Sequence, residues 1–269
     1  MNSPTHRATN EMFFQLVALL LSVIIIHTIY VTVVRPNADS TIRHHAEMAA
    51  AGEEYVVPRS FFIVVKDIEQ ESCFILMFWA LAIMGYKTRT SMREKHMLEL
   101  PLMSIAEGSR VLPDDASQLA RPLQALPDEQ RSYLLPRALQ TALTRFQVTD
   151  SVQFATEAVT NVCDTENDRL DSELSMVRYI TWAIPSIGFI GTVRGIGAAL
   201  GQAHEAMEGN IAGVTSSLGV AFNSTFIALL ISMVVMFFMH QLQLIQERLV
   251  LDSQAYCENK LLRFLKAAK

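Results

Sequence analysis

The stretch IPSIGFIGTVRGIGAALG, residues 184–201, decides the fold class, because it is apolar enough for a membrane yet rich in residues that lipid does not select. It contains one proline, five glycines, one threonine and one arginine. A membrane-spanning helix needs about 20 predominantly apolar residues. Small residues along such a helix allow a second helix to approach closely. The stretch therefore predicts a spanning helix that packs tightly against a neighbour.

The composition of the whole chain supports a membrane protein. Of its 269 residues, 51% are hydrophobic and only 18% are charged, whereas soluble domains carry about 25% charged residues. The net charge of −5 argues against a nucleic-acid-binding protein, which needs a basic face. The three cysteines, Cys73, Cys163 and Cys257, match no metal-binding or redox spacing. We therefore expect them to be reduced and structural, with no metal site.

Four segments are apolar enough to cross a bilayer, and we assign them as transmembrane helices at residues 12–34, 68–86, 177–203 and 214–239. The first is longer than the apolar region of a signal peptide, which is about 7–15 residues, and no small-residue cleavage site follows it. We therefore interpret it as a retained span. No alternating strand pattern is present. The fold class predicted is all-α: a polytopic membrane protein with four transmembrane helices and helical cytoplasmic extensions.

The placement of lysine and arginine predicts the orientation, because cytoplasmic loops of membrane proteins are enriched in both. With the N-terminus inside, 17 of the 22 basic residues fall on the cytoplasmic side, four lie outside and Arg194 lies within the membrane. Both termini are therefore placed in the cytoplasm. The remaining segments are a cytoplasmic N-terminus 1–11, a periplasmic loop 35–67, a cytoplasmic helical region 87–176, a periplasmic turn 204–213 and a cytoplasmic helical tail 240–269.

The last two spans each carry a strip of small and hydroxyl-bearing residues. At 100° per residue, the members of each strip share one face of a helix. The strips belong to consecutive helices and each places a threonine at a similar depth, so together they could offer oxygens to a passing ion; plain helix packing is the alternative. The third span contributes Pro185, Gly188, Thr192, Gly195 and Ala199, and the fourth contributes Ser217, Ala221, Ser224, Thr225, Ala228 and Ser232.

These residues resemble the MotA/TolQ/ExbB ion-channel subunits of bacterial membrane motors. The run GFIGTVRGI, residues 188–196, looks like the third-helix pattern of that family, and AFNSTFIALLIS, residues 221–232, is similar to its last-helix pattern. The run ENDRLDSELSMVRYITWAIPSIG that leads into the third span also fits. The resemblance covers roughly residues 166–235 well and the rest of the chain only in layout.

The resemblance implies a homopentamer in the bacterial inner membrane around a pore that holds single-span partners of the MotB/TolR/ExbD type, usually two. Each partner carries an aspartate, whose protonation or sodium binding would be coupled to rotation and mechanical work. Thr192 and Thr225 match the pore-facing threonines of the family. Ser224 would add a further oxygen to the ion pathway, and the other strip residues would pack against the pore or partner helix. No cofactor is implied beyond the translocated H⁺ or Na⁺, of which we favour H⁺.

Arg194 departs from the family pattern, and an arginine within a membrane is a candidate functional residue. It projects away from Thr192, so we expect it to pair with a neighbouring subunit, with Asn223, Glu205 or Glu208 as candidate partners, or to reach toward the headgroups. His27 is expected to pack or to reach outward rather than to relay protons. Which machine the chain would drive, whether flagellar, envelope-energising, gliding or defensive, stays open.

Two other classes of function compete with a motor subunit. A self-sufficient channel or transporter would need its own intramembrane carboxylates, and we expect none within the four spans. A purely structural membrane scaffold would use the small-residue strips for packing alone. An enzyme is not indicated, because the chain has no phosphate-binding glycine loop, HExxH motif or nucleophile elbow.

Overall fold

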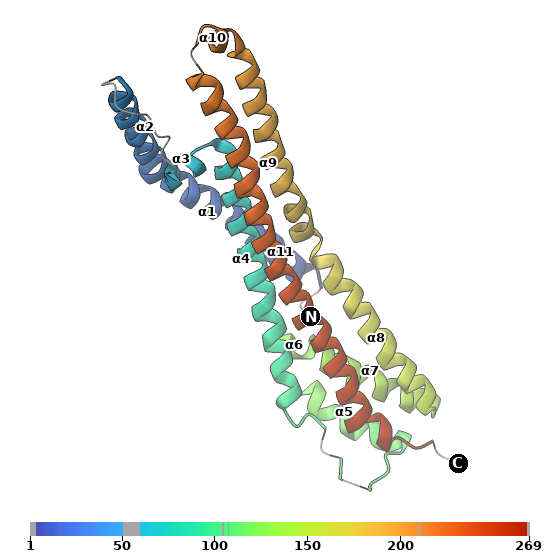
Figure 1. The fold of residues 1–269 in the computed structure, drawn as a ribbon. Helices are drawn as coiled ribbons and strands as arrows, with labels where there is room; N and C mark the ends of the chain where they lie inside the picture. Colours follow the sequence, from blue (N-terminus) through green and yellow to red (C-terminus); the bar gives the residue numbers. More distant parts are fainter. Residues whose placement is uncertain (1–3, 51–59, 104, 107, 210, 268–269) are drawn as a thin grey trace. The chain divides into compact units, whose positions relative to one another are not determined.

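The computed structural model describes residues 4–50, 60–103, 105–106, 108–209 and 211–267, which form helices joined by short connections (Figure 1). Within these residues the only extended pairing is an isolated parallel bridge between Val111 and Leu265. The predicted all-α fold is therefore confirmed. The helices are α1 (Pro4–Ile29), the π-helical turn η1 (Tyr30–Val34), α2 (Arg35–Ala50), α3 (Phe61–Val65), α4 (Ile68–His96), η2 (Met97–Glu99), η3 (Pro113–Asp115), α5 (Ala116–Gln124), α6 (Asp128–Arg131), α7 (Leu134–Thr149), α8 (Val152–Glu173), α9 (Ser175–Gly201), α10 (Ala203–Met207), α11 (Ala212–Lys260) and η4 (Leu262–Phe264).

Four helical stretches in the described part of the chain are long and apolar enough to cross a membrane, as predicted. The first continues beyond the predicted span, because the helix runs through η1 into α2 without a break. The sides on which the connections lie, and the finer segment boundaries, stay predictions. The four stretches are Glu11–His44, Ile68–Glu99, Val152–Gly201 and Ala212–Phe264.

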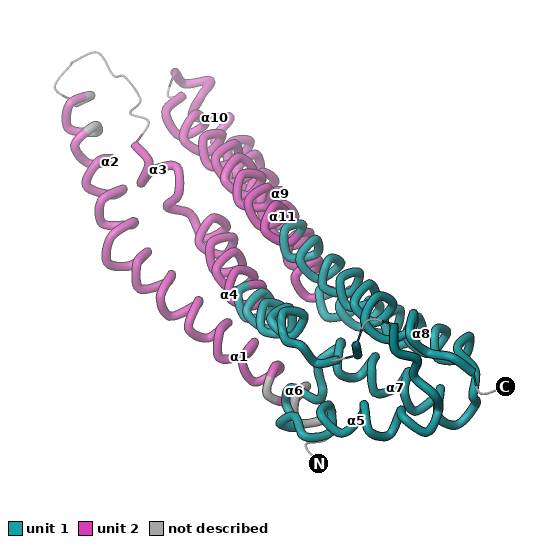
Figure 2. The backbone as a smooth tube through the Cα atoms, turned by 90° about the horizontal axis from the view of Figure 1, so that it is seen from below, with its two compact units in different colours: residues 1–6, 85–175, 240–269 teal, residues 7–84, 176–239 magenta. Residues whose placement is uncertain are grey.

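The chain divides into two compact units (Figure 2). Unit 1 comprises residues 1–6, 85–175 and 240–269, and unit 2 comprises residues 7–84 and 176–239. Unit 1 therefore holds the polar end of α4, helices α5 to α8 and the second half of α11. Unit 2 holds the apolar parts of α1, α4, α9 and α11.

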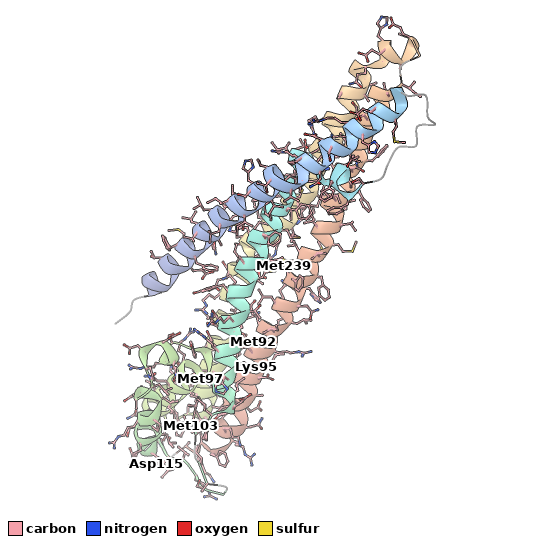
Figure 3. All side chains as sticks on the ribbon, turned by 90° about the vertical axis from the view of Figure 1, so that its left-hand side faces the viewer. Met92, Lys95, Met97, Met103, Asp115 and Met239 are labelled. Carbon is pink, nitrogen blue, oxygen red and sulfur yellow. The ribbon has the colours of Figure 1, made fainter. Side chains whose placement is uncertain are left out.

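The core of unit 1 is built around the hairpin of α7 and α8. Leu139, Leu143 and Phe146 recur at helical spacing along α7 and are wholly buried in one cluster with residues of α5, α8 and α11. Asp150 ends α7 in the left-handed conformation, with a φ of 50°. Ser151 then caps α8, because its side chain accepts a hydrogen bond from the backbone nitrogen of Phe154, the third residue of that helix. Met97 and Met103, labelled in Figure 3, are also buried in unit 1.

Buried charges in unit 1 are paired. The carboxylate of Glu166 accepts hydrogen bonds from Arg137 at 3.2 Å and from Arg169 at 2.6 Å. Glu94 accepts from the backbone nitrogen of Leu134 at 3.2 Å, at the first residue of α7, where free N–H groups and the helix dipole favour a carboxylate. These contacts satisfy groups whose burial would otherwise be costly.

Unit 2 is a set of apolar helices linked by a few polar contacts. The indole nitrogen of Trp79 in α4 donates to the backbone oxygen of Gln15 in α1 at 2.9 Å. Pro185 lies inside α9 and has no N–H, so the carbonyl of Thr181, four residues earlier, loses its usual helical partner. The hydroxyl of Ser232 in α11 donates to that carbonyl at 3.2 Å. The hydrogen bond missing from α9 is thus replaced by one from a side chain of α11, because an unpaired carbonyl is costly in an apolar environment.

Candidate functional site

Helices α9 and α11 lie side by side in unit 2 and approach until their backbones are in contact (Figure 1). A Cβ atom placed on Gly195 would lie 2.7 Å from the nitrogen of Ala221 and 2.7 Å from the carbonyl oxygen of Ser217. A Cβ atom on Gly188 would collide with Ala228. Small residues therefore set the separation of the two helices.

The remaining residues of the two predicted strips lie at or near this contact. Their part in a pore or against a partner helix is untested and stays a prediction. Gly188, Gly195, Ala199, Ala221, Ala228 and Ser232 are buried, whereas Pro185 and Ser217 are half-buried.

The hydroxyls of Thr192 in α9 and Thr225 in α11 meet at this contact and form a hydrogen bond with each other. Thr192 also lies 3.2 Å from the carbonyl oxygen of Ala221, and Thr225 lies 3.2 Å from that of Gly188. Each hydroxyl has one proton and two lone pairs, so it can donate to only one acceptor at a time. Both threonines are half-buried. The pair can therefore redirect its protons and present oxygen lone pairs to a cation at its open side.

Ser224 points to a different neighbour from the threonines. It is buried, and its hydroxyl donates to the carbonyl of Val220 at 2.8 Å. It also accepts a hydrogen bond from the amide of Gln70 in α4 at 3.3 Å. Gln70 is wholly buried and donates as well to the carbonyl of Val64 at 3.2 Å. The Ser224 hydroxyl is thus occupied in joining α11 to α4.

Arg194 has a partner within its own chain. Its guanidinium donates to both carboxylate oxygens of Glu69, through Nε at 2.7 Å and through Nη2 at 2.7 Å. This bidentate geometry is the strong form of an arginine–carboxylate pair. Asp67, just before α4, lies 3.8 Å from the same guanidinium; burial raises the pKa of its carboxyl, while Lys66 and Arg194 oppose that rise. The candidates named from the sequence, Asn223, Glu205 and Glu208, do not include this partner.

The expectation that the spans hold no carboxylate is wrong. Glu69 and Glu71 both lie in the first turn of α4, inside the predicted span 68–86, and both are buried. Glu71 accepts from Arg35 at 2.6 Å and contacts the Nδ1 atom of His27 at 2.7 Å. His27 therefore has a carboxylate partner in the same chain. No local pattern in the sequence names the partners of these two glutamates.

The π-helical turn η1 explains how one carboxylate reaches two residues of the same helix. His27 and Arg35 are eight positions apart, so in a regular α-helix they would differ by about 80° in direction. A π-helical turn accommodates one extra residue. The eight-residue separation then behaves like seven, which is close to two full turns. Both side chains consequently face Glu71.

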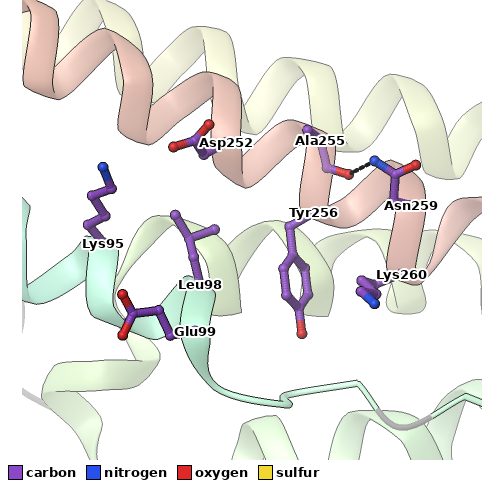
Figure 4. A pocket seen from close by; sticks show the side chains of 8 residues that line it. All are labelled: Lys95, Leu98, Glu99, Asp252, Ala255, Tyr256, Asn259 and Lys260. Atoms are coloured by element: carbon purple, nitrogen blue, oxygen red, sulfur yellow. Dashed lines mark hydrogen bonds between the residues drawn. The ribbon is translucent and has the colours of Figure 1, made fainter.

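Unit 1 also contains an open pocket of about 330 Å³ between the end of α4 and the tail of α11 (Figure 4). Its lining includes Lys95 and Lys260 together with Glu99 and Asp252. Two cations and two carboxylates give the pocket no preference for a ligand of either charge. In the described part of the chain, no group of three or more metal-ligating side chains is found.

The fold and the α9–α11 contact together define a multi-pass helical membrane protein with a hydroxyl pair between its last two spanning helices. The model of the MotA/TolQ/ExbB proton channel family matches residues 119–255, which is just over half of the chain. The chain therefore belongs to that family and is a channel protein rather than an enzyme. Membership implies partners of the MotB/TolR/ExbD type. Neither the curated proteins nor the solved structures give a match.

Proposed function

We propose that this chain is the channel subunit of an ion-driven rotary motor in a bacterial inner membrane. Five copies would surround single-span partner helices, two in number, each with an aspartate. Protons are the favoured ion, with Na⁺ as the alternative. Both termini would lie in the cytoplasm, because lysine and arginine are concentrated in the segments assigned to that side.

The observation that carries the proposal is the contact between the Thr192 and Thr225 hydroxyls. An ionised aspartate in the middle of a membrane is costly, by roughly 2.5–3.5 kcal/mol on insertion scales. Beside the threonine pair, a partner's aspartate could give up its proton, because the threonine hydroxyls could donate hydrogen bonds to the resulting carboxylate. Against an apolar wall it would be held in the protonated form. Ion transfer would then change which wall the partner prefers.

A mismatch of symmetry would turn that change of preference into rotation. Five identical walls and two partner helices cannot all be in register at once. Each ion transferred would therefore move the favourable contact to a new position. The exposed apolar side chains on α9 and α11, such as Trp182, Phe189 and Phe226, supply surface for neighbouring copies or lipid to cover.

The rival proposal of a self-sufficient channel gains little from the buried glutamates. Glu69 is held by Arg194, and Glu71 is held by Arg35 and His27. Both carboxylates are thus engaged by side chains of their own chain rather than left to face an open path. The proposal therefore still requires a partner's carboxylate.

The test is reconstitution of the full chain with its single-span partner in vesicles, with proton entry followed by an enclosed pH-sensitive dye. Thr192→Val together with Thr225→Val should abolish proton entry while a five-fold particle remains visible by imaging, because valine keeps the shape and removes the oxygens. Thr215→Val is the matched control, since that hydroxyl donates to the carbonyl of Ile211, the residue just before α11, at 3.0 Å. Unchanged flux in the double variant would refute the assigned role. Flux without the partner would favour a self-sufficient channel.

A further inference from the structure

The first turn of α4 binds both α9 and α11, and in each helix the bound residue lies close to the threonine. Glu69 binds Arg194, which follows Thr192 by two residues in α9. The next residue, Gln70, binds Ser224, which directly precedes Thr225 in α11. Successive residues of a helix point about 100° apart, so adjacent side chains of α4 can reach two different neighbours.

A fixed positive charge at Arg194 is a problem for a pathway that carries cations. The guanidinium stays protonated under all ordinary conditions. It lies within two residues of Thr192, and Arg194 is half-exposed rather than enclosed. Unless it is neutralised, its field would oppose the approach of any cation to the threonine pair and would stabilise an ionised partner aspartate at lower pH.

We propose that Glu69 is a positioning and charge-balancing residue of the ion pathway, which neutralises Arg194 and sets the ion concentration at which the pathway works. This inference rests on the proposed function. Glu69 is 6% exposed and uses both carboxylate oxygens on the guanidinium, so the compensation is local and geometrically fixed. Asp67 is the other carboxylate near Arg194, at 3.8 Å, and Lys66 precedes it. Glu71, two residues after Glu69, is held by His27 and Arg35.

The expected size of the effect follows from Coulomb's law. One unit charge at about 10 Å, with an effective dielectric constant of about 20, changes a cation equilibrium by on the order of tenfold. Loss of the Glu69 charge should therefore lower the pH of half-maximal proton flux by about one unit. When Na⁺ is the ion, the Na⁺ concentration for half-maximal flux should rise by on the order of tenfold.

The alternative is that Glu69 acts only in packing. Its side chain does lie close to α9, because a Cβ atom on Gly191 would be 3.2 Å from the Glu69 Cγ atom. A packing role and a charge role predict different results when both partners of the pair are changed. Glutamine at both positions removes both charges; at position 69 it also keeps the side-chain volume, whereas at position 194 it shortens the side chain.

The experiment compares Glu69→Gln, Arg194→Gln and the double variant, each as the full chain with its partner in the same vesicles. The pH of half-maximal flux is read with the pH-sensitive dye, and a parallel series varies Na⁺. Glu69→Gln should lower the pH of half-maximal flux by about one unit, whereas Arg194→Gln should not lower it. The double variant should return the midpoint to the original value. Asp67→Asn is the matched control and should give a smaller shift of the same sign, since its contact with Arg194 is longer, at 3.8 Å.

A double variant that is as impaired as Glu69→Gln, or more so, would overturn the inference in favour of packing. If Glu69→Gln alone fails to assemble, the double variant decides: assembly with a normal midpoint supports charge balance, and failed assembly refutes it. Absence of threonine-dependent flux in the unaltered complex would instead reject the proposed function, and the inference with it.

Discussion

Replacing Gly195 by alanine should separate α9 from α11, and a second glycine of the same helix supplies the control. The new Cβ atom would lie 2.7 Å from two backbone atoms of α11, which cannot swing away as a side chain can. The two helices must therefore move apart. At Gly197, two residues further along α9, a Cβ atom would meet nothing within 4 Å.

The magnitude is best taken as the difference between these two variants. Inserting a methyl group into a tightly packed contact costs about 1–3 kcal/mol. Alanine is also a better helix former than glycine by up to about 1 kcal/mol, but this gain is common to both variants and cancels in the difference. Gly195→Ala should therefore be less stable than Gly197→Ala by about 1–3 kcal/mol, which is roughly a 5- to 150-fold change in the unfolding equilibrium.

The assay is reversible unfolding of the full chain in mixed micelles, followed by circular dichroism as the fraction of denaturing detergent increases. Proton flux gives a second readout, because separation of the helices would lengthen the 3.2 Å contact from Thr192 to the Ala221 carbonyl. Equal stability of the two variants, or a less stable Gly197 variant, would refute the conclusion that backbone contact at Gly195 sets the distance between α9 and α11.

Two further predictions concern unit 1. Phe146→Ala should destabilise it by about 3–5 kcal/mol, because Phe146 is wholly buried between α7 and α8; Val148→Ala in the same helix should cost less than about 0.5 kcal/mol, because Val148 is 79% exposed. Chemical unfolding of both variants checks this, and similar costs would contradict the assigned core. Ser151→Ala removes the cap of α8 and should cost about 1 kcal/mol, whereas Ser151→Asp keeps a capping oxygen and should preserve stability. Hydrogen exchange at the start of α8 measures both variants, and an equal loss of protection in the two would contradict the capping role.

How much of the site could be predicted from the sequence depends on the range of each interaction. The segments that can span a membrane follow from length and composition, so the sequence predicts all four of the stretches that the structure describes. The close approach of α9 and α11 is a property of small residues repeated at helical spacing, as at Gly188 and Gly195. Prolines at positions 113, 122, 127 and 136 interrupt unit 1 and favour short helices there.

The partners of single polar side chains could not be predicted in the same way. Arg194 and Glu69 are 125 positions apart, and Gln70 and Ser224 are 154 apart. A helical wheel gives the direction of a side chain but not the identity of the helix on that side. For this reason the helical wheel places Ser224 with Thr225, although the Ser224 hydroxyl contacts α4. The wheel likewise does not indicate that the turn containing Glu69 and Glu71 is a polar contact region.

The sequence by itself determined that this is an all-helical, four-span membrane protein with small-residue faces on its last two spans, because length, apolar content and helical period are local properties of a chain. Only the tertiary structure decided which hydroxyl meets which, that Arg194 is held by Glu69, and that a π-helical turn aligns His27 with Arg35 on Glu71. Burying a charge or a hydroxyl among apolar helices is costly without a partner in reach, and the packing of distant segments fixes which partner that is.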